Sequence, residues 1–150
     1  MKKSVVAKLV SIILVIMLMV GVVCIFFLPS LYDFFKDEYV EVFSKHLVWY
    51  RVAFYICYII CLGVVYQLLK VFYCIYQDSP FKKEVEKSLK ITAVLFMCLF
   101  VVVTVKCIFM PTILSFAVLL ICFIASLSFY VLASVIKTAI FYKNENDYTI

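Results

Sequence analysis

The stretch ILSFAVLLICFIASLSFYVLASVI, residues 113–136, contains 24 residues and no charged side chain. As an α-helix rising 1.5 Å per residue, it is long enough to cross the hydrocarbon core of a bilayer, which is roughly 30 Å thick. Further apolar runs of at least 18 residues lie at 9–28, 52–69 and 91–108. The chain is 68% hydrophobic and 15% charged, so its charged residues are too few to cover a soluble domain. We therefore predict an all-α integral membrane protein, a single domain over residues 1–150 with spans at about 9–28, 49–72, 90–108 and 113–137.

The first run follows a basic N-terminus, as a secretory signal does. It is longer than the apolar region of a typical signal peptide, and no Ala-x-Ala cleavage site follows it. We interpret it as a retained first span, with a removed signal as the alternative.

The basic residues predict the orientation, because cytoplasmic loops of membrane proteins are enriched in Lys and Arg. If the N-terminus is cytoplasmic, only four of the 14 lie on the outer side, namely Lys36, Lys45, Arg51 and Lys106. The other ten lie on the inner side: Lys2, Lys3, Lys8, Lys70, Lys82, Lys83, Lys87, Lys90, Lys137 and Lys143. We predict an antiparallel four-helix transmembrane bundle with both termini in the cytoplasm.

Two basic side chains, Arg51 and Lys106, stand among apolar residues near the predicted outer ends of their helices. Extension of both side chains to the lipid headgroups is one explanation. The alternative is an outer polar cluster, in which they pair with acids of the first outer loop, namely Asp33, Glu38 and Glu41.

Small and polar residues mark helix contacts in lipid, where apolar side chains gain little from meeting one another. They recur every four residues in the second and fourth runs, and residues four apart share a helix face. The predicted packing residues are Ala53, Cys57, Cys61, Cys122, Ser126, Tyr130 and Ser134. A redox pair at Cys57 and Cys61, and a polar pathway along the fourth helix, are the functional alternatives.

The spans contain no Asp or Glu, whereas proton-coupled transporters usually carry a carboxylate or another relay group inside the membrane. The seven cysteines form no CxxC motif, and one histidine is too few for a familiar zinc site. We expect a protein that is not an enzyme and that has no cofactor and no metal. Pairing of Cys24 with Cys107 stays open.

The inner segment over residues 79–90 predicts an amphipathic elbow. Ser79 suits an N-cap and Pro80 the first helical position. Phe81, Val85 and Leu89 would then share one face among charged residues. That face would lie on anionic lipid or dock a cytoplasmic partner.

The C-terminal tail, residues 138–150, continues the fourth helix to about Lys143 and ends in polar residues. The tail would add as a strand to a partner's sheet or dock its last residues, unless it is a frayed end.

The chain resembles the small bacterial four-span membrane proteins grouped as domain-of-unknown-function family 2975. In the elbow, the resemblance lies in Pro80, Phe81, Glu84 and Leu89. In the tail it lies in Glu145, Asn146, Asp147, Thr149 and Ile150. Lys82, Val85 and Tyr148 depart from the Thr, Asn and Leu that are usual there. The resemblance implies no known activity, but such proteins resemble membrane partners of small helix-turn-helix regulators.

These observations predict a multi-pass sensor or regulatory protein of a bacterial plasma membrane, with a helix-turn-helix regulator as partner and no direct contact to nucleic acid. The predicted contact residues are Phe81, Lys82, Lys83, Glu84, Lys87, Glu145, Asn146, Asp147, Tyr148, Thr149 and Ile150. One alternative is a small permease, channel or efflux component acting as a homo-oligomer. Another is an immunity or stress-protection protein that acts through the outer loop over residues 32–46.

Overall fold

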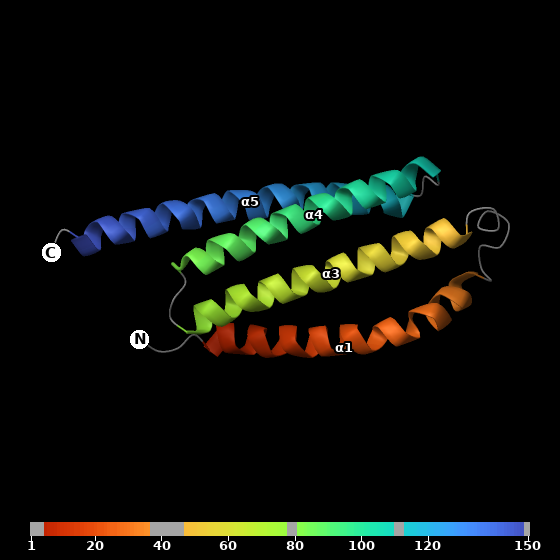
Figure 1. Ribbon diagram of the computed structural model, residues 1–150, viewed down its shortest axis with the longest axis horizontal. Helices are drawn as coiled ribbons and strands as arrows, with labels where there is room; N and C mark the ends of the chain where they lie inside the picture. Colours follow the sequence, from red (N-terminus) through yellow and green to blue (C-terminus); the bar gives the residue numbers. More distant parts are fainter. Residues whose placement is uncertain (1–4, 37–46, 78–80, 110–112, 149–150) are drawn as a thin grey trace.

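The structure is a computed structural model that describes residues 5–36, 47–77, 81–109 and 113–148. These ranges contain four helices, α1 (Val5–Lys36), α3 (Leu47–Tyr76), α4 (Lys83–Phe109) and α5 (Ile113–Tyr148) (Figure 1). Each is long and apolar enough to cross a membrane. The predicted all-α class with four apolar spans is confirmed, and it indicates a multi-pass membrane protein.

Helix α1 is longer than its apolar run. The predicted first span ends at about residue 28, but α1 contains Pro29 and ends at Lys36. Proline removes one backbone N–H and kinks a helix, and α1 changes direction toward its end (Figure 1).

Helices α3 and α5 are also longer than a bilayer core requires. Helix α3 has 30 residues, about 45 Å at 1.5 Å per residue, and ends at Tyr76, past the predicted span end at about residue 72. Helix α5 has 36 residues, about 54 Å by the same measure. It continues to Tyr148 instead of ending near Lys143.

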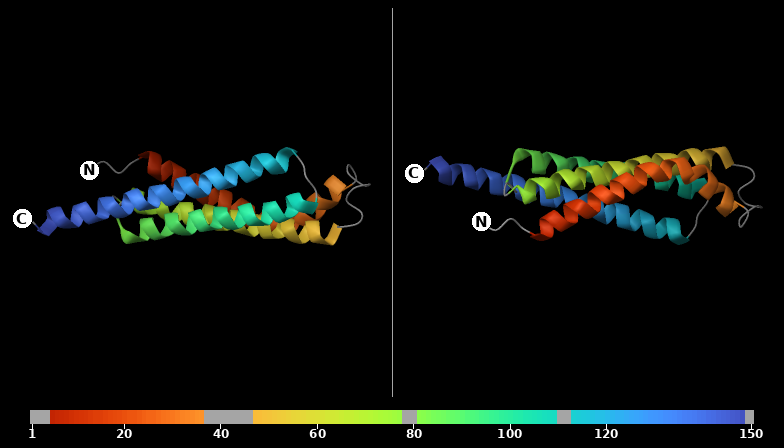
Figure 2. Two further views of the ribbon diagram at one scale, coloured as in Figure 1. Left: turned by 90° about the horizontal axis from the view of Figure 1, so that it is seen from above. Right: turned by 90° about the horizontal axis from the view of Figure 1, so that it is seen from below.

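The helices form an open row. The extensive contacts among the described residues join α1 to α3, α3 to α4 and α4 to α5. Figure 1 shows this order across the molecule, with both chain ends toward the same side, and Figure 2 shows α1 and α5 crossing the direction of the other helices at the two edges. This arrangement differs from the compact bundle that we expected. In lipid, no hydrophobic drive brings α1 and α5 together.

The buried positions of α5 follow a heptad repeat. Its buried residues are spaced by four or seven positions, namely Ser115, Cys122, Ser126, Ala133 and Ile140. Helix α1 shows the same repeat at Ala7, Leu14 and Gly21, of which Ala7 and Leu14 are buried. A repeat of 3.5 residues keeps one seam facing its neighbour and favours crossing angles of about 20°.

Glycine allows α1 and α3 to approach closely. A Cβ atom added to Gly21 would lie 2.5 Å from Leu62 Cδ2. The hydroxyl of Tyr58 donates a hydrogen bond of 2.7 Å to the carbonyl oxygen of Gly21. The other glycine, Gly63, faces Leu95 of α4 at 3.4 Å by the same measure. Both glycines of the chain therefore lie at helix contacts.

We predict that Gly21→Val separates α1 from α3 and lowers the thermal stability of the detergent-solubilised protein. The Leu62 side chain must shift to admit the added methyl groups, and overpacking of this kind costs about 1–3 kcal/mol. Gly63→Ala is the matched control, because its Cβ meets Leu95 at an ordinary contact distance. Equal melting temperatures for wild type and Gly21→Val would contradict this account of the α1–α3 contact.

Candidate functional site

Three helices meet in one apolar cluster near the turn between α3 and α4. Its buried members are Val71 of α3, Val85 and Leu89 of α4, and Ala133 of α5. Partly buried side chains pack against them, namely Cys74, Ile75, Phe129 and Ile136. We call these eight residues the three-helix cluster. It fixes the start of α4 against the end of α3 and the middle of α5.

The apolar face of the elbow lies inside this cluster, which corrects the sequence interpretation. Val85 and Leu89 are 3% and 2% exposed, so neither lipid nor a partner can cover them. Phe81, predicted to share their face, is 44% exposed and precedes the helix. The amphipathic pattern was correctly recognised, but its apolar side packs on the protein's own helices.

Helix α4 begins at Lys83 and not at Pro80. The backbone N–H groups of Val85 and Glu86 donate to the carbonyl oxygen of Lys82, at 3.0 and 3.5 Å. The predicted N-cap Ser79 and first helical residue Pro80 lie outside the described residues.

The charged side of the elbow faces outward. Lys82, Lys83, Glu84 and Lys87 are exposed. Glu86 and Lys90 form an ion pair of 2.6 Å one turn apart, and the Cys74 thiol lies 3.9 Å from Glu84 Oε2. Further exposed lysines stand near the same end of the helices, namely Lys8, Lys70, Lys137 and Lys143. This end of the row is therefore strongly basic.

The tail is a helical extension next to the elbow. Helix α5 continues past the start of α4 (Figure 1), and its Phe141 and Tyr142 are exposed, with ring centroids 6.0 Å apart. Residues 146–148 are helical, and residues 149 and 150 lie outside the described part. Strand addition by this segment would require unwinding of α5, so the structure favours docking in helical form.

At the opposite end, the outer polar cluster is described only in part. Lys106 Nζ donates to the hydroxyl of Ser115 on α5 at 3.3 Å, so its ammonium group contacts a neighbouring helix. Arg51 is exposed, and Asp33 lies on α1. The side chain of Asp33, and Glu38 and Glu41 altogether, lie outside the described residues, as does most of the outer loop assigned to immunity. Their pairing with Arg51 and Lys106 stays a prediction.

Only some of the predicted packing residues of α5 are buried. Cys122 and Ser126 are buried, and Ser126 donates a hydrogen bond of 2.9 Å to the carbonyl oxygen of Ala93 on α4. Tyr130 and Ser134 are exposed. Residues four apart advance by about 400° on a helix with 3.6 residues per turn, so a strict four-residue series drifts about 40° per step. It leaves the contact face that the heptad repeat maintains.

The corresponding series on α3 is divided in the same way. Ala53 and Cys57 are partly buried and Cys61 is exposed. All seven cysteines, including Cys24 and Cys107, are free thiols in the structure. Within the described ranges, His, Cys, Asp and Glu side chains form no group of three suited to a metal ion.

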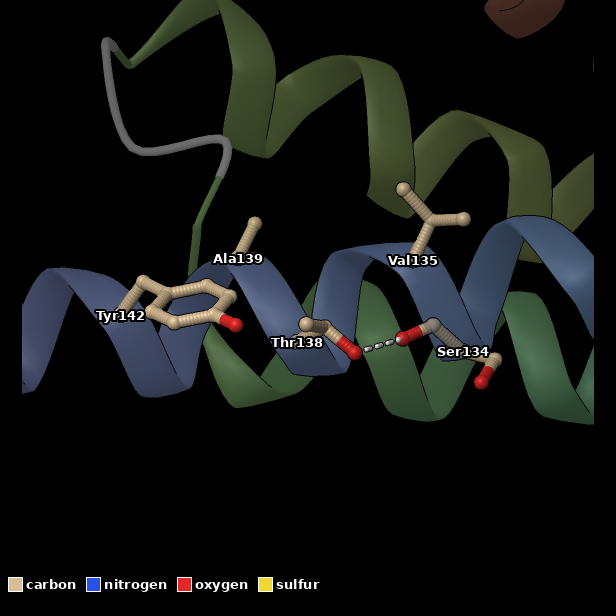
Figure 3. A pocket seen from close by; sticks show the side chains of 5 residues that line it. All are labelled: Ser134, Val135, Thr138, Ala139 and Tyr142. Atoms are coloured by element: carbon tan, nitrogen blue, oxygen red, sulfur yellow. Dashed lines mark hydrogen bonds between the residues drawn. The ribbon is translucent and has the colours of Figure 1, made fainter.

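Two exposed hydroxyls of α5, those of Ser128 and Thr138, bond to their own helix. Figure 3 shows an open hollow lined by Ser134, Val135, Thr138, Ala139 and Tyr142, all from α5. Thr138 donates to the carbonyl oxygen of Ser134 at 3.1 Å (Figure 3), and Ser128 to that of Ile124 at 2.8 Å. Hydroxyls with these partners do not by themselves form a polar pathway.

Gln67 is the residue that the sequence interpretation missed. Its Oε1 atom is buried and accepts no hydrogen bond from the part of the chain that the structure describes. The signal was visible, because Gln67 is the one Asn or Gln inside the four apolar runs, and polar side chains inside spans are often functional. A search for acidic residues alone passes over it.

Comparison of the chain with known protein families, with curated proteins and with solved structures gives no match. The resemblance to domain-of-unknown-function family 2975 therefore rests on the elbow and tail residues quoted above.

We predict that Ser126→Ala destabilises the α4–α5 contact by about 0.6–1 kcal/mol, the usual value of an interhelical hydrogen bond in a membrane protein. The substitution removes the donor to Ala93 and leaves a buried carbonyl oxygen without it. Ser128→Ala is the control, because the Ser128 hydroxyl is exposed and bonds to its own helix. Equal loss of stability in the two variants would show that Ser126 does not join the helices.

We also predict that Ala133→Leu loosens the elbow. Ala133 is 0% exposed, so a larger side chain displaces the start of α4 from the three-helix cluster. Limited trypsin digestion should then cleave faster at Lys82, Lys83 and Lys87. Ser134→Leu, at the exposed neighbouring position, should digest at the wild-type rate. Unchanged cleavage in Ala133→Leu would mean that the cluster does not hold the elbow.

Proposed function

We propose that this chain is a non-enzymatic regulatory protein of a bacterial plasma membrane that holds a cytoplasmic helix-turn-helix regulator at the membrane surface. In this proposal the four helices cross the membrane in alternating directions and both termini are cytoplasmic. The elbow and the end of α5 form the contact surface.

The distribution of lysine supports this orientation. The exposed lysines of all four helices gather near the end that carries the elbow, whereas the described basic residues toward the other end of α3 and α4 are Arg51 and Lys106. Because cytoplasmic segments are enriched in Lys and Arg, the basic end is assigned to the cytoplasm.

The single observation that carries the proposal is the burial of the elbow's apolar face. Val85 and Leu89 anchor α4 in the three-helix cluster, so the charged side of the elbow is held outward in a fixed place. The exposed rings of Phe141 and Tyr142 stand on the neighbouring helix. Protein interfaces typically combine aromatic anchors with charges that match opposite charges on the partner. A partner with an apolar pocket for the two rings and an acidic rim for the elbow lysines would fit this surface.

The resemblance to domain-of-unknown-function family 2975 supports the choice of partner, because it lies in the same two segments. In the α5 hollow, the Thr138 hydroxyl bonds to its own helix, which does not favour the permease or channel alternative.

The test is co-purification from native membranes with full-length chains. Charge reversal at the elbow, Lys82→Glu with Lys83→Glu and Lys87→Glu, and the pair Phe141→Ala with Tyr142→Ala should each reduce recovery of a DNA-binding protein. Phe26→Ala is the control, because Phe26 is exposed on α1 away from both segments. Recovery of the same proteins by all four chains, or of no DNA-binding protein by any, would refute the proposal.

Orientation has a separate test. A reporter that is active only in the cytoplasm, fused after residue 150, should be active. Activity of a periplasm-specific reporter at that position would place the basic end outside and remove the proposed surface from the cytoplasm.

A further inference from the structure

Gln67 lies on the side of α3 that faces α4. Two contacts define the register of these helices. The thiol of Cys74 lies 3.9 Å from Glu84 Oε2, and a Cβ atom at Gly63 would lie 3.4 Å from Leu95 Cδ1. Gln67 falls between Gly63 and Cys74. The buried residues Val64 and Val71 lie three positions before it and four positions after it, so they are one heptad apart. Its carboxamide is therefore set in an apolar helix contact.

The carboxamide destabilises the arrangement that contains it. Its Oε1 atom is buried, and no donor among the described residues reaches it. A buried acceptor without a hydrogen bond costs about 1–3 kcal/mol, and hydrocarbon supplies no replacement donor. An arrangement of the helices that gave Gln67 a donor would recover this free energy.

The facing helix holds a suitable donor close to this level. Ser88 is 6% exposed and lies on α4 between Glu84 and Leu95, the two residues that define the register with α3. The register places it about one turn from the level of Gln67. The other buried hydroxyl nearby, that of Thr92, already donates to the carbonyl oxygen of Ser88 at 2.9 Å.

We propose that α3 and α4 have a second register, in which the Ser88 hydroxyl donates a hydrogen bond to the Gln67 carboxamide. A slide of about one helical turn, roughly 5 Å, brings the two residues level. Packed interfaces change between discrete arrangements of this kind, because interdigitated side chains resist intermediate positions. Gln67 and Ser88 are thus the two halves of a conformational switch within the membrane.

The slide moves the elbow, because the elbow is the start of α4. Val85 and Leu89 would shift against Val71, and the outward charges of the elbow would move relative to α3 and α5. This inference rests on the proposed function only for what the elbow binds. The change of register takes place within the chain and is measured without any partner.

The experiment uses Glu84→Cys beside the native Cys74 as a reporter of register, in the full-length protein reconstituted in bilayers. Residues 74 and 84 face each other in the observed register and lie about one turn farther apart in the second. Disulfide formation between residues 74 and 84 under mild oxidant is measured by peptide mass spectrometry. With Gln67 and Ser88 intact, the disulfide should form rapidly in only part of the molecules, namely those in the observed register. We call this part the fast-forming fraction.

Gln67→Leu should raise the fast-forming fraction, because without the carboxamide only the observed register is stable. Ser88→Ala should do the same, and the double variant should go no further than either single one. Thr104→Val is the matched control, because the Thr104 hydroxyl bonds to Phe100 of its own helix. Gln67→Met, close to glutamine in shape, gives the same readout if leucine prevents folding.

The result that would overturn the proposal is specific. If Gln67→Leu or Gln67→Met raises thermal stability but leaves the fast-forming fraction unchanged, Gln67 is a static buried group. Strictly additive effects of Gln67→Leu and Ser88→Ala would also overturn it, because two halves of one hydrogen bond cannot act independently. Neither outcome bears on whether the elbow binds a regulator, which the co-purification decides.

Discussion

Hydrocarbon offers no hydrogen bonds, and the structure depends on that constraint. Backbone groups within the membrane must be bonded within the chain, which explains why each apolar run lies inside one continuous helix. Hydroxyl groups follow the same rule. Thr104 and Ser128 bond back to their own helices, whereas Ser126 bonds across to α4. Gln67 is the exception among the described residues, and for that reason it is informative.

Apolar side chains gain little from meeting in lipid, so close packing decides which helices touch. Gly21 lets α1 approach α3, and small residues such as Ala133 let α5 approach its neighbours. The result is an open row joined at three contacts, with the three-helix cluster at its basic end. Because the apolar side of the elbow packs in that cluster, the elbow's charges point outward. A shift of α4 would therefore move these charges at the surface where a partner is proposed to dock.

The amphipathic pattern of the elbow correctly predicted an apolar side. The pattern does not show which surface covers that side, and in the structure Val85 and Leu89 pack on α3 and α5. The four-residue series on α5 identified Cys122 and Ser126 and then failed at Tyr130, because such a series drifts around a helix. The search for charged residues in the spans overlooked Gln67. Helix ends were the least predictable feature, since α1 continues through Pro29 and α4 begins at Lys83.

Apolar length and composition determined by themselves that the chain has four helices able to cross a membrane, because crossing hydrocarbon requires about 20 apolar residues whatever surrounds them. Only the tertiary structure decided that the helices form a row, that the elbow's apolar face is internal, and that Gln67 lacks a donor. These depend on the distance of each side chain from residues far away in the chain. Local periodicity carries no information about those distances.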